Sequence, residues 1–149
     1  GYMISPEVLG IPVKLDPLET KGKGAMLKTF QDLTALCDST GICLFTTFGI
    51  GLPEIAGMYR EAVGSDETDE EILLKGERIW NLEKRFNLEA GVEKDTLPPR
   101  LLREALPSGP AKGKVSELQT MLAEYYEARN WTADGIPTDE KLAELSVTY

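Results

Sequence analysis

Histidine is absent from the 149-residue chain, and cysteine occurs only twice, as Cys37 and Cys43. Without histidine, the chain alone can build no Ser-His-Asp triad, no His-Glu zinc motif and no histidine general base. Two thiolates are also too few for a complete four-thiolate zinc or iron–sulfur site. Any such site must take ligands from elsewhere, and we assign no catalytic residue to this chain.

Positive charge is scarce as well, because 16 Lys and Arg stand against 25 Asp and Glu, a net charge of −9. An acidic surface without a basic stripe repels phosphates, so we expect neither nucleic acid nor an anionic membrane as a partner. No apolar run approaches the roughly 20 residues that a membrane span needs. Residues 1–5 lack the basic region of a signal peptide. These observations favour a cytoplasmic protein.

The chain also lacks internal repeats, low-complexity segments and any shift in composition along its length. Apolar residues make up 42% of it, close to the average of globular proteins. A chain of this length can bury one core of useful size. We therefore predict a single domain over residues 1–149.

Helical periodicity dominates the first half of the chain. Asp16 and Pro17 are typical of a helix start, and the helix that follows should end near Gly41, after turn-forming polar residues. Residues 42–48 form a short apolar run, which the pattern assigns either to a buried strand or to a buried turn of helix. The expected buried face of the first helix carries Met26, Phe30, Leu33 and Cys37.

The longest predicted helix begins after Thr68, which forms a capping box with Glu71, and ends near Asn87. Within it, Gly76 indicates a close contact with another helix. Its predicted buried side carries Ile72, Ile79, Leu82 and Phe86.

Proline, glycine and capping residues mark the remaining elements. Short helices are predicted from Pro53 to about Ala62, from Pro98 onward, over residues 118–125, and from the Thr138 cap to about Leu145. Residues 106–114 form a Pro/Gly-rich loop. The predicted fold is all-α: an irregular multihelical domain.

Residues 38–43 are the most informative segment for function. A helix end, a glycine turn and then Cys43 place a thiol on irregular backbone, where thiolates can be presented to a metal or cluster. Asp38 can accept hydrogen bonds from a polar ligand. Spacing alone favours a plainer interpretation, a C-terminal helix turn followed by a small core cysteine. Cys37, on the apolar face, is expected to be a packed thiol, and a reducing cytoplasm argues against its pairing with Cys43.

Three other features have structural explanations. The acidic run over residues 66–71 suits the positive end of a helix dipole without any metal. The Gly22-Lys23-Gly24 stretch is too short for a phosphate loop. The aromatic residues fit helix packing, namely Trp80, Tyr125, Tyr126 and Trp131.

Residues 38–43 also carry a family resemblance. They match the Asp-x-x-Gly-Leu-Cys motif of aldehyde:ferredoxin oxidoreductases in register, with Ile42 in place of leucine. Residues 78–87 resemble the Arg-Ile-x-Asn-Leu-Glu-Arg-x-Phe-Asn helix of that family. The stretches similar to other parts of its C-terminal end are residues 1–12, 16–23, 95–98, 106–113, 124–131 and 135–138. The resemblance thus covers nearly the whole chain, in order.

The resemblance implies the C-terminal part of a larger multidomain enzyme that oxidises aldehydes to carboxylates and reduces ferredoxin. Such enzymes hold tungsten, or molybdenum, between two pterin dithiolenes beside a [4Fe–4S] cluster. By the motif match, Cys43 would be the fourth cluster thiolate and the metal ligand of this chain, Asp38 would hydrogen-bond a pterin, and the backbone of Gly41 and Ile42 would lie against it.

The family's other three cluster cysteines, its pterin-binding β-rich domain and its histidine near the metal are absent from this sequence. The start at Gly1 fits a fragment of a longer protein. We therefore expect the isolated chain to be inactive and to bind no complete cofactor, with the remaining domains and ferredoxin as partners. The resemblance also allows a homodimer of the full-length enzyme. The competing hypothesis is a helical protein-interaction module in which Cys43 is a core residue and the acidic face meets a basic partner.

Overall fold

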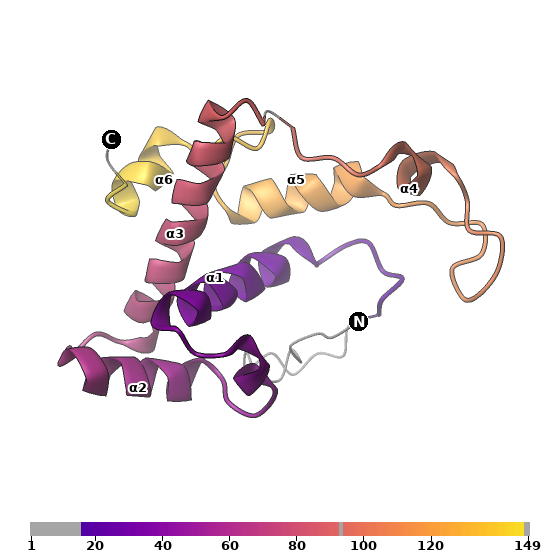
Figure 1. Ribbon diagram of the computed structural model, residues 1–149. Coiled ribbons are helices and arrows are strands. Elements are labelled where there is room, and N and C mark those ends of the chain that lie inside the picture. The colour runs from indigo at the N-terminus through magenta and orange to yellow at the C-terminus, as the bar shows by residue number, and fades with distance from the viewer. Residues whose placement is uncertain (1–15, 93, 148–149) are drawn as a thin grey trace.

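The computed structural model describes residues 16–92 and 94–147 and consists of helices joined by loops (Figure 1). The all-α prediction is confirmed. The α-helices are α1 (Gly24–Thr40), α2 (Leu52–Val63), α3 (Asp69–Glu89), α4 (Pro99–Arg103), α5 (Leu118–Ala128) and α6 (Asp139–Glu144), and a 3-10 helix, η2, spans Leu44–Phe48. Residues 1–12, part of the resemblance, lie outside the described range. None of the helices within residues 16–92 and 94–147 has both the length and the hydropathy of a membrane-spanning helix.

Helix starts follow the local capping chemistry that the sequence predicts. The Thr68 hydroxyl accepts a hydrogen bond from the Glu71 backbone N–H at 3.2 Å, and the Glu71 carboxylate accepts one from the Thr68 N–H at 2.7 Å. The Thr138 hydroxyl caps α6 by accepting from the Lys141 N–H. Pro53 lies in the first turn of α2. These predicted helices are confirmed, as are α4 and α5.

The predicted helix start at Asp16 and Pro17 is wrong. The Asp16 carboxylate accepts a hydrogen bond from the Leu18 N–H at 2.8 Å, and this stabilises a turn. Gly22 then has a φ of +77°, which lies outside the right-handed helical range. The first helix therefore begins only at Gly24.

The molecule is organised around the crossing of α1 and α3. Both α1 and α5 lie on one side of α3 (Figure 1). At the crossing, a Cβ atom built on Gly76 would lie 1.9 Å from the backbone oxygen of Asp32. Only glycine permits this approach, so the predicted close helix contact at Gly76 is confirmed.

The apolar core is small and lies where α1, α2 and α3 meet. Its buried members are Leu33, Leu36, Cys37, Ile55, Ala56 and Ile72. A second cluster is aromatic and joins the end of α5 to the middle of α3. Its members are Tyr125, Tyr126 and Trp131, with Trp80 packed against them. The predicted packing roles of Cys37 and of the aromatic residues are confirmed.

The predicted buried side of α3 is wrong in part. Ile72 is buried, but Leu82 is 38% exposed and Phe86 is 67% exposed. The helix instead turns a mostly polar face inward, with Gly76, Glu77, Asn81 and Lys84 buried. The close approach at Gly76 selects this face, and ion pairs described below compensate the buried charges.

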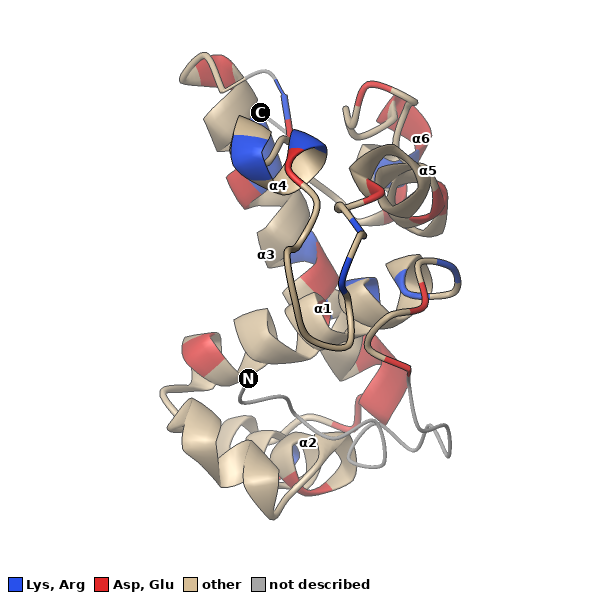
Figure 2. Ribbon diagram, turned by 90° about the vertical axis from the view of Figure 1, so that its right-hand side faces the viewer, with Lys and Arg blue, Asp and Glu red and all other residues tan. Residues whose placement is uncertain are grey.

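An arm formed by α4 and the loop after it extends away from the crossing (Figure 1). The loop doubles back on itself, because the Leu106 N–H donates to the Lys114 carbonyl at 3.1 Å and the Gly113 N–H donates to the Leu106 carbonyl at 2.9 Å. The predicted loop is confirmed. Figure 2 shows basic and acidic positions spread over the helices, without a continuous basic stripe in the part of the chain that is drawn in colour.

Candidate functional site

The segment of residues 38–43 forms the C-terminal end of α1 and the connection to η2. Gly41 ends α1 in the left-handed conformation, with a φ of +76°, and its N–H donates to the Asp38 carbonyl at 3.3 Å. This is the glycine helix end that the sequence predicts. Asp38 is exposed, and a Cβ atom on Gly41 would meet nothing within 4 Å. One side of this turn is therefore open to a large group.

Cys43 is exposed and lies directly before the first residue of η2. Its backbone carbonyl accepts hydrogen bonds from the Thr46 N–H at 2.9 Å and from the Thr46 hydroxyl at 2.7 Å. These bonds fix the backbone that carries the thiol. The two cysteines are not joined in a disulfide.

Cys37, six residues earlier, has the opposite environment. Its side chain is fully buried in the small apolar core. Burial, and then the charge of neighbouring Asp38, raise the pKa of the Cys37 thiol. A raised pKa disfavours the thiolate that binds metals, so Cys43 is the better candidate ligand of the two.

The apolar run after Ile42 is mostly at the surface, which corrects the expectation of a buried segment. Phe45 is 68% exposed and stacks on Phe48 with ring centroids 5.9 Å apart. Only Thr47 of η2 is buried, and its hydroxyl donates to the Leu44 carbonyl. The burial predicted for residues 42–48 would hold only if a surface outside the described residues covers this run.

Metal-binding residues do not gather at this segment or elsewhere within residues 16–92 and 94–147. No three His, Cys, Asp or Glu side chains in these ranges are placed to hold a metal ion together. In the acidic run, Glu67 pairs with Lys75 at 2.6 Å, and Asp69 pairs with Arg60 at 2.7 Å.

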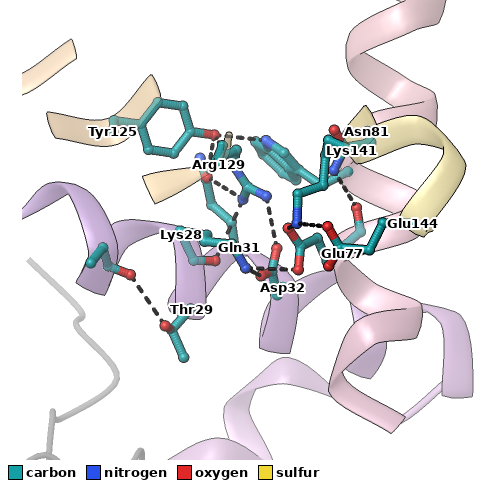
Figure 3. Close-up of polar contacts among 12 residues, drawn as sticks. Lys28, Thr29, Gln31, Asp32, Glu77, Asn81, Tyr125, Arg129, Lys141 and Glu144 are labelled. Atoms are coloured by element: carbon teal, nitrogen blue, oxygen red, sulfur yellow. Dashed lines mark hydrogen bonds and ion pairs between the residues drawn. The ribbon is translucent and has the colours of Figure 1, made fainter. Parts of the chain in front are cut away.

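Apart from residues 38–43, the structure contains a buried polar cluster that the sequence does not predict. It lies between α1, α3 and the end of α5 (Figure 3). Arg129, at its centre, has no exposed surface. Its guanidinium donates to Asp32 at 3.0 Å and to the hydroxyl of Tyr125 at 2.6 Å. It also donates to Gln31 at 2.9 Å. Arg129 packs over three aromatic rings at 5.2–5.5 Å, those of Trp80, Tyr125 and Trp131.

The charges of this cluster balance. Lys28 bridges Asp32 at 2.8 Å and Glu77 at 2.9 Å. Lys141 of α6 pairs with the other oxygen of Glu77 at 3.3 Å and with Glu144 at 2.9 Å. The Glu77 oxygen that pairs with Lys141 accepts no hydrogen bond, and ion pairs between buried charges on different helices hold these helices in fixed relative positions. The cluster therefore fixes α1, and with it the helix that presents residues 38–43.

No local signal could have identified the whole cluster. The Lys28 and Asp32 pair has the i, i+4 spacing of a helix surface pair. Arg129, however, lies 97 residues from Asp32 in sequence. No pattern within a single sequence pairs two residues that lie this far apart.

The buried carboxylate of Glu77 makes stability dependent on acid. Burial by itself would raise the pKa of Glu77, but the hydrogen bond and charge of Lys28 and the charge of Lys141 outweigh it, so the pKa lies below its ordinary value. A lowered folded-state pKa stabilises the fold above the unfolded value of 4.5 and ceases to do so as the pH falls through the folded value.

We expect Glu77→Gln to be less stable than the wild type at about pH 7, with the difference shrinking as the pH falls below 4.5 and the wild-type carboxylate takes up its proton. Urea unfolding of both proteins across this range measures the difference. A difference that is independent of pH would show that the charge of Glu77 does not contribute.

Comparisons with known proteins cover almost the whole chain. The family model described as "Aldehyde ferredoxin oxidoreductase, domains 2 & 3" matches residues 1–147. The tungsten-containing aldehyde ferredoxin oxidoreductases of Pyrococcus abyssi and Pyrococcus furiosus are each 52% identical to it, over 98% and 99% of the chain and 25% of the relative. An aliphatic sulfonate oxidoreductase, WOR-like subunit, of Pyrococcus furiosus is 34% identical over 80% of the chain and 20% of the relative. The chain thus spans about a quarter of the length of the tungsten-containing relatives.

Proposed function

The chain belongs to the aldehyde ferredoxin oxidoreductase family, and on that basis we propose that it is the C-terminal helical domain of an enzyme that oxidises aldehydes to carboxylates with ferredoxin as acceptor. Residues 1–149 would form one domain, completed by the remaining domains of the parent chain. When bound, a tungsten or molybdenum bis-pterin supplies the two-electron oxidation, and a [4Fe–4S] cluster carries the electrons onward.

The single observation that carries the proposal is the placement of Cys43. Its thiol is exposed beside the exposed apolar residues Leu44 and Phe45, whereas Cys37 is sealed in the core. A cluster thiolate has to be screened from water. An exposed thiol surrounded by an apolar surface fits a cluster ligand that another domain covers. That domain would also supply the remaining cluster ligands. Cys43 is thus the proposed fourth thiolate of the cluster.

Asp38, Gly41 and Ile42 are the proposed pterin contacts. The exposed carboxylate of Asp38 can accept hydrogen bonds from ring N–H groups. The turn at Gly41 is open on the side where a Cβ atom would project, which leaves room for a flat ring against the backbone. The segment therefore fits a pterin in two respects, the open shape of the turn at Gly41 and the hydrogen-bonding capacity of Asp38.

The test is Cys43→Ala in the full-length parent protein, with Cys37→Ala as the matched control. We expect Cys43→Ala to lower the iron content, to remove the electron paramagnetic resonance signal of the reduced [4Fe–4S] cluster and to abolish aldehyde-dependent ferredoxin reduction. Cys37→Ala should keep all three, because Cys37 only packs. An unchanged cluster signal in Cys43→Ala would refute the ligand assignment and favour the interaction module.

A further inference from the structure

The outward side of α3 carries an apolar stripe made of Ile79, Leu82 and Phe86. Their i, i+3, i+7 spacing places them along one line of the helix. The stripe lies away from the buried polar face, which contacts α1 through Gly76 and Glu77 and contacts Trp131 through Asn81. Ile79 is half-buried, and the other two are exposed. α3 therefore carries apolar residues on a side that the described part of the chain leaves open.

A groove of about 620 Å³ adjoins the stripe at Ile79. Its walls come from α2, through Met58 and Val63, from α3, and from the end of α1. Both α2 residues are about half exposed. The groove and the stripe share Ile79. The groove is mostly apolar, although Lys75 and Arg78 of α3 also line it. Apolar residues grouped in this way differ from the scattered single residues that are ordinary on a soluble protein.

The groove reaches the candidate cofactor segment directly. Ser39, Thr40 and Ile42, which lie between Asp38 and Cys43, are among its lining residues. A polypeptide that fills the groove would therefore also cover the flank of the segment that presents Cys43.

We propose that the stripe and the groove are the seat of an apolar segment from the rest of the same parent polypeptide. The chain is 25% of the length of its relatives, which leaves 75% of such a polypeptide outside it. The proposal rests on the proposed function in one respect: the cluster must be completed by the parent chain itself. The surface beside Cys43, the proposed cluster ligand, is then covered by another part of the same parent chain and not by a second copy.

Hydroxyl-radical footprinting of the full-length holoenzyme, read by mass spectrometry, tests this assignment. Leu74 is the internal control, because it lies on the same helix outside the stripe and is 40% exposed, against 38% for Leu82. We expect Leu82, Phe86 and Met58 to lose most of their labelling relative to the urea-unfolded protein, while Leu74 remains labelled. Labelling of Leu82 and Phe86 as readily as Leu74 would overturn the proposal.

The same experiment on the parent protein diluted until it is monomeric separates the two occupants. Protection that persists in the monomer supports a segment of the same chain, and protection lost on dilution overturns that choice in favour of a second copy. The outcome is independent of the cluster test. A protected stripe with an unchanged cluster in Cys43→Ala would refute the proposed function alone, whereas a labelled stripe with the cluster lost would refute this inference alone.

Discussion

Replacement of Gly76 by alanine is expected to lower the free energy of unfolding by at least about 3 kcal/mol, at the upper end of the costs of overpacking. The added Cβ atom would lie 1.9 Å from the oxygen and 2.7 Å from the carbonyl carbon of Asp32. Both atoms belong to the backbone of α1, so relief requires α1 to move as a whole. That movement would pull Asp32 away from the cations that pair with it.

Gly57→Ala is the matched control, because Gly57 lies inside α2 and a Cβ atom there meets nothing within 4 Å. Alanine should stabilise that helix by about 1 kcal/mol through its higher helix propensity. Urea unfolding followed by circular dichroism measures both variants. Equal effects of the two substitutions would show that the crossing at Gly76 is looser than the structure has it.

Arg129→Met is expected to cost about 3–5 kcal/mol, the usual effect of removing one partner from a buried charged cluster. Asp32 would keep Lys28 but lose its second cation. The hydroxyl of Tyr125 and the amide oxygen of Gln31 would each lose a donor inside the protein. The apolar side chain of methionine replaces the volume but none of the hydrogen bonds.

Arg100→Met serves as the control for removing an arginine. The side chain of Arg100 is 82% exposed, and its ion pair with Glu104 spans 3.6 Å, so its loss should change stability by less than about 0.5 kcal/mol. Trp80 and Trp131, the only two tryptophans, both contact Arg129. Tryptophan fluorescence in urea therefore reports directly on the cluster. An Arg129→Met variant as stable as Arg100→Met would disprove the structural role.

The elements that the sequence predicts well are those set by neighbouring residues. Thr68 and Glu71 form their capping box within one turn, and Gly41 ends α1 through its own left-handed backbone. The error at Asp16 has the same local character, because an aspartate before a proline also forms a turn. Helix class and most helix ends were thus available from short-range chemistry.

The sequence also singles out the candidate site, residues 38–43, which contains the proposed ligand and pterin contacts Asp38, Gly41, Ile42 and Cys43. The structure adds the contrast between the two cysteines: Cys37, which polar residues follow in sequence, is buried, and Cys43, which lies within an apolar run, is exposed. This contrast depends on which side of each residue another helix covers, and a linear pattern does not contain that information.

Short-range patterns in the sequence predict that the chain is helical, where most helices begin and end, and which segment is the candidate site. Packing between the helices selects the face of α3 that turns inward and assembles the buried cluster around Arg129. Caps and turns form between residues a few positions apart, whereas Arg129 and Asp32 meet across 97 positions. A helix with two faces able to be buried commits to one only when a specific neighbour, here α1 at Gly76, packs against it.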